Sequence, residues 1–459
     1  MLRSLSHGAP DGALPIMQPL RSQAVEFDAQ WHRPLKGTAI DTAWKAEPSM
    51  PIAKSPPLIA PERLARADKI LFIAHLALGD FTYLQNCLRA FAEAYPHIAV
   101  HLWVDERRRT RRASEWAHLQ KYALYDWLAE CRFIAKVYDR TYSPALFKDS
   151  LAEARRQDYP LVVSLAVLER HKYARMARKI SPHGFVVGQK KRVRPYDLPK
   201  HLCYRKLDAW IPAYNAASHG GQHISDIYAG WFTQLFGMEI APAARFPRLD
   251  IDARWMRYAH AQFAAWGLRS APAGGTAEGG MASGSAAANG TYAAGSAASG
   301  QVVFVNAFSK SVERSWPLER VIGLIRTMRC APAWRDAGFV VNVVPEELAR
   351  ARVLFEAQGL ERTHLFSAED NFFQLPAILS LCGLVISVET AVMHLANAVH
   401  VPVIALMRQK TPEWAPIDKA NSTVITVAGR DDWVDSIGVQ DVMAVLEACY
   451  PRERASDPA

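Results

Sequence analysis

The stretch 384–398 constrains the fold of this chain more than any other part of the sequence. It opens with a β-branched, apolar run that is typical of a strand buried in a parallel sheet. A polar turn that holds Glu389 and Thr390 follows, then a helical run of small and apolar residues that carries His394 on its first turn, then a second apolar strand over 400–406. This order predicts a βαβ unit. Ligands bind at the turn after such a strand, where the helix start presents free N–H groups and the positive end of its dipole to a phosphate.

Charge and cysteine content narrow the class of protein. The 459 residues carry a net charge of +9, which favours an acidic partner such as a phosphorylated substrate, anionic lipid or nucleic acid. The six cysteines form no CxxC pair, so neither a zinc site nor a disulfide framework is indicated, and isolated thiols fit a reducing cytoplasm. The sequence contains no apolar run of transmembrane length and no signal-peptide pattern at its start. We expect a cytoplasmic protein, with peripheral attachment to the inner membrane as an alternative.

A second βαβ unit opens the N-terminal half. Residues 69–74 predict a strand, 81–94 a helix and 98–104 the next strand, with Gly79 and Asp80 at the first turn. In one interpretation Gly79 permits the turn and Asp80 caps the helix. In the other, Asp80 is a carboxylate at the carboxyl edge of the sheet, placed for general-base chemistry.

A dense block of arginines follows that second strand and precedes a helix predicted over 115–130. Its members are Arg107, Arg108, Arg109, Arg111 and Arg112. A solvated loop is the ordinary interpretation of such a run, and a dock for an anionic acceptor or membrane surface is the alternative. The block contains no aromatic residue on which bases could stack, so a nucleic-acid groove is not favoured.

Low-complexity sequence divides the rest of the chain. Residues 271–300 consist almost wholly of Gly, Ala, Ser and Thr, which predicts a flexible insertion between two α/β halves. Residues 189–220 are predicted to be a polar loop region. The predicted units are an irregular extension (1–60), an N-terminal Rossmann-like domain (61–250), a linking helix with the insertion (251–300) and a C-terminal Rossmann-like domain (301–459).

Alternating strands and helices in both halves predict an α/β protein with two Rossmann-like domains that face each other across a cleft. Fold alone does not give function, but four stretches together resemble glycosyltransferase family 9, the ADP-heptose:lipopolysaccharide heptosyltransferases of the GT-B fold. The four stretches are 69–80 with its Leu-Gly-Asp turn, 304–317 with Arg-Ser-Trp-Pro, 389–396 and 411–416. The resemblance covers about 69–450 without 271–300.

The resemblance implies a role for each matching position. Asp80 corresponds to the general base that deprotonates the acceptor hydroxyl, and Arg314 stands where the family has a lysine near the donor diphosphate. The implied reaction is an inverting sugar transfer that requires no metal and no cofactor other than the nucleotide-sugar co-substrate, expected to be ADP-heptose. The N-terminal domain would bind the acceptor and the C-terminal domain the donor. The implied donor-binding residues are Arg314, Glu347, Glu389, Thr390, Ala391 and His394.

Two departures from the family signature leave alternatives open. Glu389 replaces the signature aspartate and Ala391 its glycine, which could alter the donor or weaken the site. The expected function is transfer of a sugar onto a lipopolysaccharide or another cell-envelope glycan. The alternatives are a non-catalytic GT-B-like scaffold that binds a glycan or a partner, a transferase that uses another nucleotide sugar, and an epimerase of the same fold. The expected partners are the nucleotide sugar, an anionic glycolipid or glycan and the inner face of the membrane, but no nucleic acid.

Overall fold

The computed structural model describes residues 56–213, 221–270 and 301–449. Most of the predicted N-terminal extension (1–55) and the whole predicted insertion (271–300) lie outside the described residues. Where the description begins, the chain is already packed: the backbone N–H groups of Leu58 and Ile59 donate to the carbonyls of Gln234 and Leu235, and Ile59 is buried. The described residues contain no helix long and apolar enough to cross a membrane.

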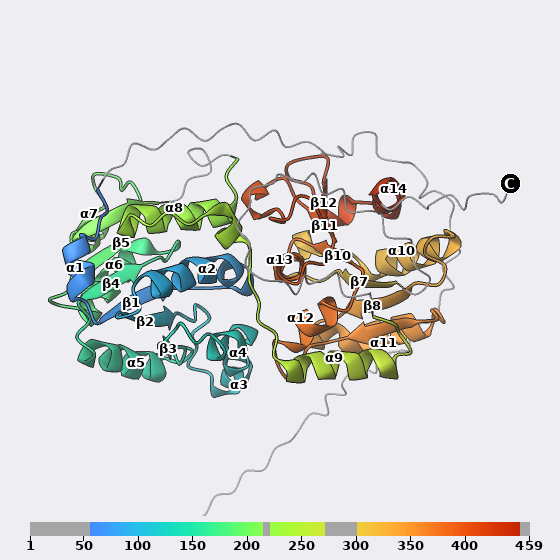
Figure 1. Cartoon of the computed structure of the whole chain (residues 1–459), viewed down its shortest axis with the longest axis horizontal. Helices are drawn as coiled ribbons and strands as arrows, with labels where there is room; N and C mark the ends of the chain where they lie inside the picture. Colours follow the sequence, from blue (N-terminus) through green and yellow to red (C-terminus); the bar gives the residue numbers. More distant parts are fainter. Residues whose placement is uncertain (1–55, 214–220, 271–300, 450–459) are drawn as a thin grey trace, which may run out of the picture. The chain divides into compact units, whose positions relative to one another are not determined.

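Two parallel sheets of six strands each form the framework (Figure 1). The first sheet has the order β3-β2-β1-β4-β5-β6. Its strands are β1 (Lys69–Ala74), β2 (Ala99–Val104), β3 (Lys136–Tyr138), β4 (Leu161–Ser164), β5 (Phe185–Lys190) and β6 (Ala209–Pro212). Its helices are α1 (Pro61–Arg66), α2 (Leu78–Ala94), α3 (Trp116–Gln120), α4 (Ala123–Ala129), α5 (Pro144–Arg156), α6 (Arg170–Ile180), α7 (Leu198–Tyr204) and α8 (Ile224–Phe236), with 3₁₀ turns η2 (Ala113–Glu115) and η3 (Pro242–Arg245).

The second sheet repeats this topology, with the order β12-β11-β10-β7-β8-β9. Its strands are β7 (Val302–Asn306), β8 (Gly338–Asn342), β9 (Thr363–Phe366), β10 (Leu384–Val388), β11 (Val403–Met407) and β12 (Ser422–Thr426). The helices of this half are α9 (Ala253–Ala265), α10 (Leu318–Cys330), α11 (Leu348–Glu356), α12 (Gln374–Leu379), α13 (Ala391–Ala398) and α14 (Val439–Cys449). The 3₁₀ turns are η4 (Val312–Arg314), η5 (Pro345–Glu347), η6 (Pro412–Trp414) and η7 (Val434–Ser436).

Both sheets therefore have the doubly wound Rossmann order, and the prediction of two Rossmann-like domains is confirmed. In this order the connections turn to opposite sides between two central strands, and the crevice at their carboxyl ends binds ligands. These central strands are β1 and β4 in the first sheet and β7 and β10 in the second.

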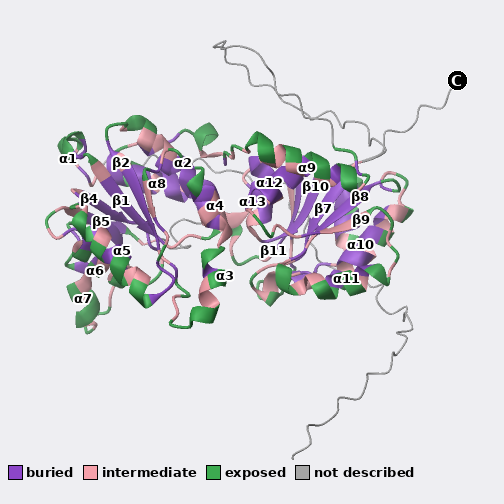
Figure 2. Ribbon diagram, turned by 90° about the horizontal axis from the view of Figure 1, so that it is seen from below, coloured by how far each residue is buried: buried purple, intermediate pink, exposed green. Residues whose placement is uncertain are grey.

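The core follows from strand alternation, because successive side chains point to opposite faces of a sheet. In β1, Ile70 and Phe72 enter one hydrophobic cluster while Leu71 and Ile73 enter another. The cluster that holds Phe72 also holds Phe304 of β7, so one apolar core is shared by both domains. Figure 2 shows the strands of both sheets buried between helices whose outer faces are exposed.

Two local predictions were wrong. Residues 189–220, predicted as a loop region, contain α7 and β6, and the helix predicted over 115–130 is broken into α3 and α4 around Lys121 and Tyr122. Helix α7 buries only Tyr204, so it lacks the apolar stripe by which a helix is recognised from sequence. The long helix from Val439 and the strand over 69–74 have the predicted positions.

Candidate active site

The carboxyl edge of the second sheet is lined by a polar network at its central strands. Asn306 ends β7, and its register partner in β10 is Ser387. The Asn306 amide donates to Ser387 Oγ at 3.0 Å and to Thr390 Oγ1 at 2.9 Å, and it accepts from Asn342 Nδ2 at 2.8 Å. Thr390 is the N-cap of α13, and its hydroxyl accepts the Val392 N–H at 3.3 Å. The network thereby fixes the start of α13, whose free N–H groups and positive dipole end face this edge.

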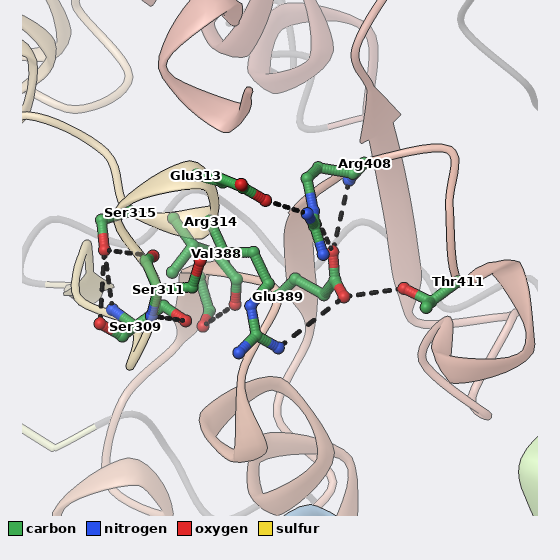
Figure 3. Close-up of polar contacts among 10 residues, drawn as sticks. Ser309, Ser311, Glu313, Arg314, Ser315, Val388, Glu389, Arg408 and Thr411 are labelled. Carbon is green, nitrogen blue, oxygen red and sulfur yellow. Dashed lines mark hydrogen bonds and ion pairs between the residues drawn. The ribbon is translucent and has the colours of Figure 1, made fainter. Parts of the chain in front are cut away.

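The loop after β7 is held in a compact shape by its serines. Ser315 Oγ accepts the Ser309 N–H at 3.1 Å and donates to the Ser311 carbonyl at 3.1 Å (Figure 3). Trp316 is buried and donates from its indole to the Ile437 carbonyl at 2.9 Å, which anchors the end of the loop. Arg314, the last residue of η4, is therefore presented from a well-fixed backbone.

Glu389 is the centre of the charged cluster at this edge (Figure 3). It is only 5% exposed, and its Oε1 accepts the Thr411 hydroxyl at 2.7 Å. Arg408 Nε lies 3.5 Å from Oε2, and Arg314 Nη1 lies 4.0 Å from Oε1. Arg408 is also paired with Glu313 at 2.8 Å. One buried acid thus orients two arginines from two loops at the start of α13, which is an arrangement suited to an anionic ligand.

Asp80 lies at the corresponding edge of the first sheet, as the third residue of α2. Its Oδ2 accepts the N–H of Ala77, the N-cap residue, at 3.0 Å. The helix therefore begins three residues earlier than predicted, and Asp80 stabilises its first turn from within instead of preceding it. Its Oδ1 accepts the Tyr228 hydroxyl at 3.1 Å. Burial of the carboxyl group raises the pKa of Asp80 above its ordinary value, while these hydrogen bonds and the charge of Lys310 act in the opposite direction. A carboxylate whose pKa is raised toward neutrality is a better proton acceptor in catalysis.

Lys310 connects the two edges. It belongs to the loop after β7, and its ammonium lies 5.4 Å from the centre of the Tyr122 ring in the N-terminal domain. Burial and the neighbouring Arg108 lower the pKa of Lys310, whereas the carboxylates of Glu106 and Asp80 raise it. A cation from the C-terminal domain therefore lies within electrostatic reach of Asp80.

His394 is placed at the contact between the two domains. Its Nδ1 lies 2.8 Å from the Tyr83 hydroxyl of α2, and a Cβ added to Gly79 would lie 3.8 Å from its ring. The residue is 2% exposed, and burial lowers the pKa of His394 to about 3, with a further contribution from His223. His394 is therefore a neutral imidazole at physiological pH, beside the helix turn that carries Asp80.

Of the other two predicted donor-binding residues, one belongs to the cluster around Glu389 and one does not. Ala391 is the first residue of α13, directly after Thr390, so it belongs to the cluster at that edge. Glu347 ends η5 beyond β8, and it pairs with Arg350 at 3.2 Å instead of entering the Glu389 cluster. Its predicted ribose contact remains a prediction.

The arginine block divides into paired and unpaired members. Arg108 is paired with Glu106 at 2.7 Å, Arg109 with Asp105 at 2.5 Å and Arg112 with Glu115 at 3.1 Å. Arg109 also lies 3.6 Å from the centre of the Phe147 ring, so it is part of the local packing. Arg107 and Arg111 are exposed and have no ion-pair partner among the described residues. The dock predicted for this block remains a prediction.

Four residues of this region were not assigned a role from the sequence: Lys310, Tyr228, Arg408 and Thr411. Arg408 and Thr411 lie on the polar loop after the strand that follows the 384–398 unit, so position alone could have suggested them. Tyr228 comes from a helix far from Asp80 in sequence, and no local pattern indicates that contact. The described residues contain no cluster of three or more His, Cys, Asp or Glu placed to hold a metal.

Comparison with known proteins adds an independent result. Residues 274–432 match the family model described as glycosyltransferase family 9 (heptosyltransferase). No curated protein sequence matches the chain. The structure is similar to that of a family 9 glycosyl transferase from Veillonella parvula, with a TM-score of 0.58 and 15% identity over 83% of this chain and 97% of that one. It is also similar to the E. coli ADP-heptose lps heptosyltransferase II, with a TM-score of 0.54 and 14% identity over 83% of this chain and 98% of that one.

These neighbours share the fold with this chain over nearly their whole length, and the predicted two-domain GT-B architecture is confirmed. The family match covers the 389–396 signature and the loop that carries Arg314. Residues 274–432 are accordingly similar to glycosyltransferase family 9, as the motifs of that stretch predicted, and the described residues share the fold of the two family 9 neighbours.

Proposed function

We propose that this enzyme transfers heptose from ADP-heptose onto a lipopolysaccharide or a related cell-envelope glycan, with inversion at the anomeric carbon. The observation that carries the proposal is the contact of the two sheet edges: Lys310 of the loop after β7 lies 5.4 Å from the Tyr122 ring, and His394 of α13 is hydrogen-bonded to Tyr83 of α2, the helix that carries Asp80. It brings a base on one sheet edge and the cations of the other into one electrostatic unit. A reaction that joins two sugars needs both: a base for the attacking hydroxyl and positive charge for the leaving diphosphate.

The proposed chemistry follows from these groups. Asp80 accepts the proton of the acceptor hydroxyl as the oxygen attacks the anomeric carbon, and the bond from that carbon to the diphosphate breaks. Negative charge then grows on the departing nucleoside diphosphate. Arg314, Lys310 and the start of α13 are available to stabilise that charge, which is the contribution a metal ion makes in other transferases.

The choice of donor is supported by the comparisons. The family model carries the description heptosyltransferase, and the E. coli neighbour is by its title an ADP-heptose lps heptosyltransferase. The two departures do not break the helix start: Thr390 still caps α13, and Glu389 is satisfied by Thr411 and the arginines. We therefore assign to Glu389 the role of orienting Arg314 and Arg408 toward the diphosphate.

The site of action follows from the same proposal. The acceptor is an anionic, membrane-linked glycan, so we place the enzyme in the cytoplasm, at the inner face of the membrane. Arg107 and Arg111, the unpaired members of the arginine block among the described residues, are available to attract such an acceptor.

A thermal-melting panel tests the donor. The full chain is melted with ADP, ADP-heptose, UDP, GDP and TDP, because a ligand that binds only the folded state stabilises it, by about 2.7 kcal/mol at a hundredfold excess over its Kd. Stabilisation by ADP and ADP-heptose is the expected result. Stabilisation by another nucleotide would overturn the donor but keep the transferase. A response to none of them would favour the non-catalytic scaffold.

Acceptor-dependent product formation is the second measurement. A deacylated envelope glycan is supplied with ADP-heptose, and ADP release is followed with and without it. Release that requires the glycan supports transfer. Release at the same rate without the glycan would instead indicate hydrolysis of the donor.

A further inference from the structure

The surface around α7 combines exposed apolar side chains with a high density of cations. Every exposed large hydrophobic residue among the described residues of the N-terminal domain lies between Leu168 and Trp210. The largest exposures are those of Tyr196 (73%), Leu198 (66%) and Leu202 (59%). Monomeric proteins seldom expose such residues together unless the surface binds something.

The geometry of α7 explains why these side chains face outward. Tyr204 is buried and, with Leu207, packs into the core on that side of the first sheet. Leu198 and Leu202 are one helical turn apart, so they share a face, and that face is exposed. Figure 2 shows α7 as an exposed helix beside α6. The helix is anchored on one side and presents an apolar ridge to solvent on the other.

Positive charge surrounds this ridge. Residues 190–206 contain seven lysines and arginines and a single acid, Asp197. Six of these cations are exposed: Lys191, Arg192, Arg194, Lys200, Arg205 and Lys206. Lys200 is paired with Asp197, while Lys190 lies 4.1 Å from the centre of the Trp210 ring. The neighbouring α6 adds the exposed Lys172, Arg175 and Lys179.

We propose that the α7 surface, defined as Leu168, Lys190–Lys206 and Trp210, is the docking surface by which this enzyme binds an anionic membrane. Lipid headgroups attract the cations, and the leucines and aromatic rings enter the boundary between headgroups and acyl chains. Tyrosine and tryptophan are the aromatic residues that favour that boundary. An acidic soluble protein or a nucleic acid would match the positive charge of this surface. Neither supplies the apolar layer that Leu198 and Leu202 can enter in a membrane.

The position of the surface agrees with the proposed function, on which its biological role rests. The segment begins at Lys190, the last residue of β5. Strand β5 is separated from β1 only by β4, so the segment starts at the same carboxyl edge of the sheet at which Asp80 lies. Docking through α7 would bring the acceptor half of the site close to lipid-linked glycans.

Vesicle sedimentation tests the proposal with the full chain and no substrate. The vesicles are phosphatidylcholine alone, or phosphatidylcholine with 30% phosphatidylglycerol (roughly the anionic fraction that makes a surface attract basic segments). We expect binding to the anionic vesicles only, weakened but not abolished by salt, because the apolar part of the interaction is not screened. Equal binding to both vesicles, or no binding to either, would overturn the proposal.

Matched variants locate the surface. Leu198→Ser with Leu202→Ser should weaken vesicle binding about tenfold, from the apolar area that no longer leaves water. Lys191→Glu with Arg192→Glu should weaken it by at least the same factor and reduce its salt dependence. Val353→Ser, at an equally exposed valine of the other domain, should leave binding unchanged, and Arg111→Gln, in the arginine block, should weaken it less than either α7 variant. Equal loss in Arg111→Gln would move the dock to the arginine block and overturn the proposal.

Light scattering distinguishes a membrane dock from a contact between copies of the chain. It reports the mass of the wild-type chain: a dimer that the leucine variant converts to a monomer, without vesicle binding, would make the surface a contact between copies and overturn the proposal.

The melting shift with ADP distinguishes failure of the membrane dock from failure of the donor site. It is measured on every variant and should not change. Absence of vesicle binding in a wild-type chain that responds to ADP contradicts this inference alone, whereas vesicle binding without any nucleotide response contradicts the proposed donor site alone.

Discussion

The two domains have the same strand order but opposite chemistry at their carboxyl edges. At the edge of the second sheet, Glu389 is paired with Arg408 and approached by Arg314, and the amide of Asn306 is satisfied on both sides. At the edge of the first sheet, both ring nitrogens of His75 are buried without a hydrogen-bond partner among the described residues. Burial, with the charges of Arg107 and Arg170, lowers the pKa of His75 to about 4.

This difference indicates a division of labour. The charged groups at the second edge are already held by hydrogen bonds and ion pairs, so they need little movement when negative charge develops on a ligand. This edge is therefore suited to the leaving diphosphate. The first edge holds a carboxylate with a raised pKa and polar groups that lack partners among the described residues, which suits a site completed by its substrate. The same backbone topology thus serves two roles because the loops at its edge differ.

The largest test of this comparison is Asp80→Asn. The amide keeps the size of the side chain but cannot accept the proton, so we expect transfer to fall by about 10²–10⁴-fold. The melting shift with ADP should remain, because the cations of the other edge are untouched. A variant that loses the ADP response but retains transfer would reverse the proposed roles of the two edges.

Arg314→Gln addresses the second edge. Loss of a charge-assisted contact to the diphosphate should weaken ADP binding by about 10- to 100-fold, measured by calorimetry. Arg326→Gln is the control, because Arg326 is an arginine of the same domain that bonds only to Gln358 in the described structure. Similar losses in both variants would indicate general electrostatic attraction in place of a defined contact.

Glu389→Gln tests whether the second edge is preorganised. The change leaves Arg408 and Arg314 without their shared buried acid, so the free energy of unfolding should fall by about 1–3 kcal/mol in urea denaturation. Glu389→Asp should recover part of this loss because the charge is retained. Unchanged stability in Glu389→Gln would show that the cluster contributes no preorganisation.

Tyr228→Phe should have the smallest effect and the most specific one. The Tyr228 hydroxyl stabilises the ionised form of Asp80, so its removal raises the pKa of that carboxyl. Since the base must be deprotonated, the acid limb of the kcat profile should move to higher pH by about one unit, with activity recovered above it. Tyr83→Phe is the control. Tyr83 lies on the same helix as Asp80, but its hydroxyl bonds to His394, so its removal should not move the acid limb of the kcat profile.

Local pattern was sufficient for much of this site. The strand over 384–388, the helix from Ala391 and the turn between them follow from apolar periodicity, and Thr390 caps that helix as such a residue should. Asp80 could be placed at a sheet edge for the same reason. Arg314 and Glu389 were assigned to one ligand by the family resemblance, and the structure places both after central strands, β7 and β10, which pair side by side.

Local sequence patterns did not predict contacts between segments far apart in the chain. They also missed a helix that does not bury an apolar face in a core. The pairing of Tyr228 with Asp80 spans 148 positions, and that of His394 with Tyr83 spans 311. Helix α7 was missed because its apolar residues face outward, so the pattern that identifies a buried helix is absent.

The sequence by itself determined the elements, their alternation and the residue types at each strand end, because these depend on neighbours within a few positions. Only the tertiary structure decided which of those residues meet. It oriented Arg408 and Thr411 toward Glu389, brought Lys310 of the C-terminal domain to Tyr122 of the N-terminal domain, and turned Leu198 and Leu202 toward solvent. Charge pairing and burial are set by the packing of whole domains, and no local pattern in the chain encodes that packing.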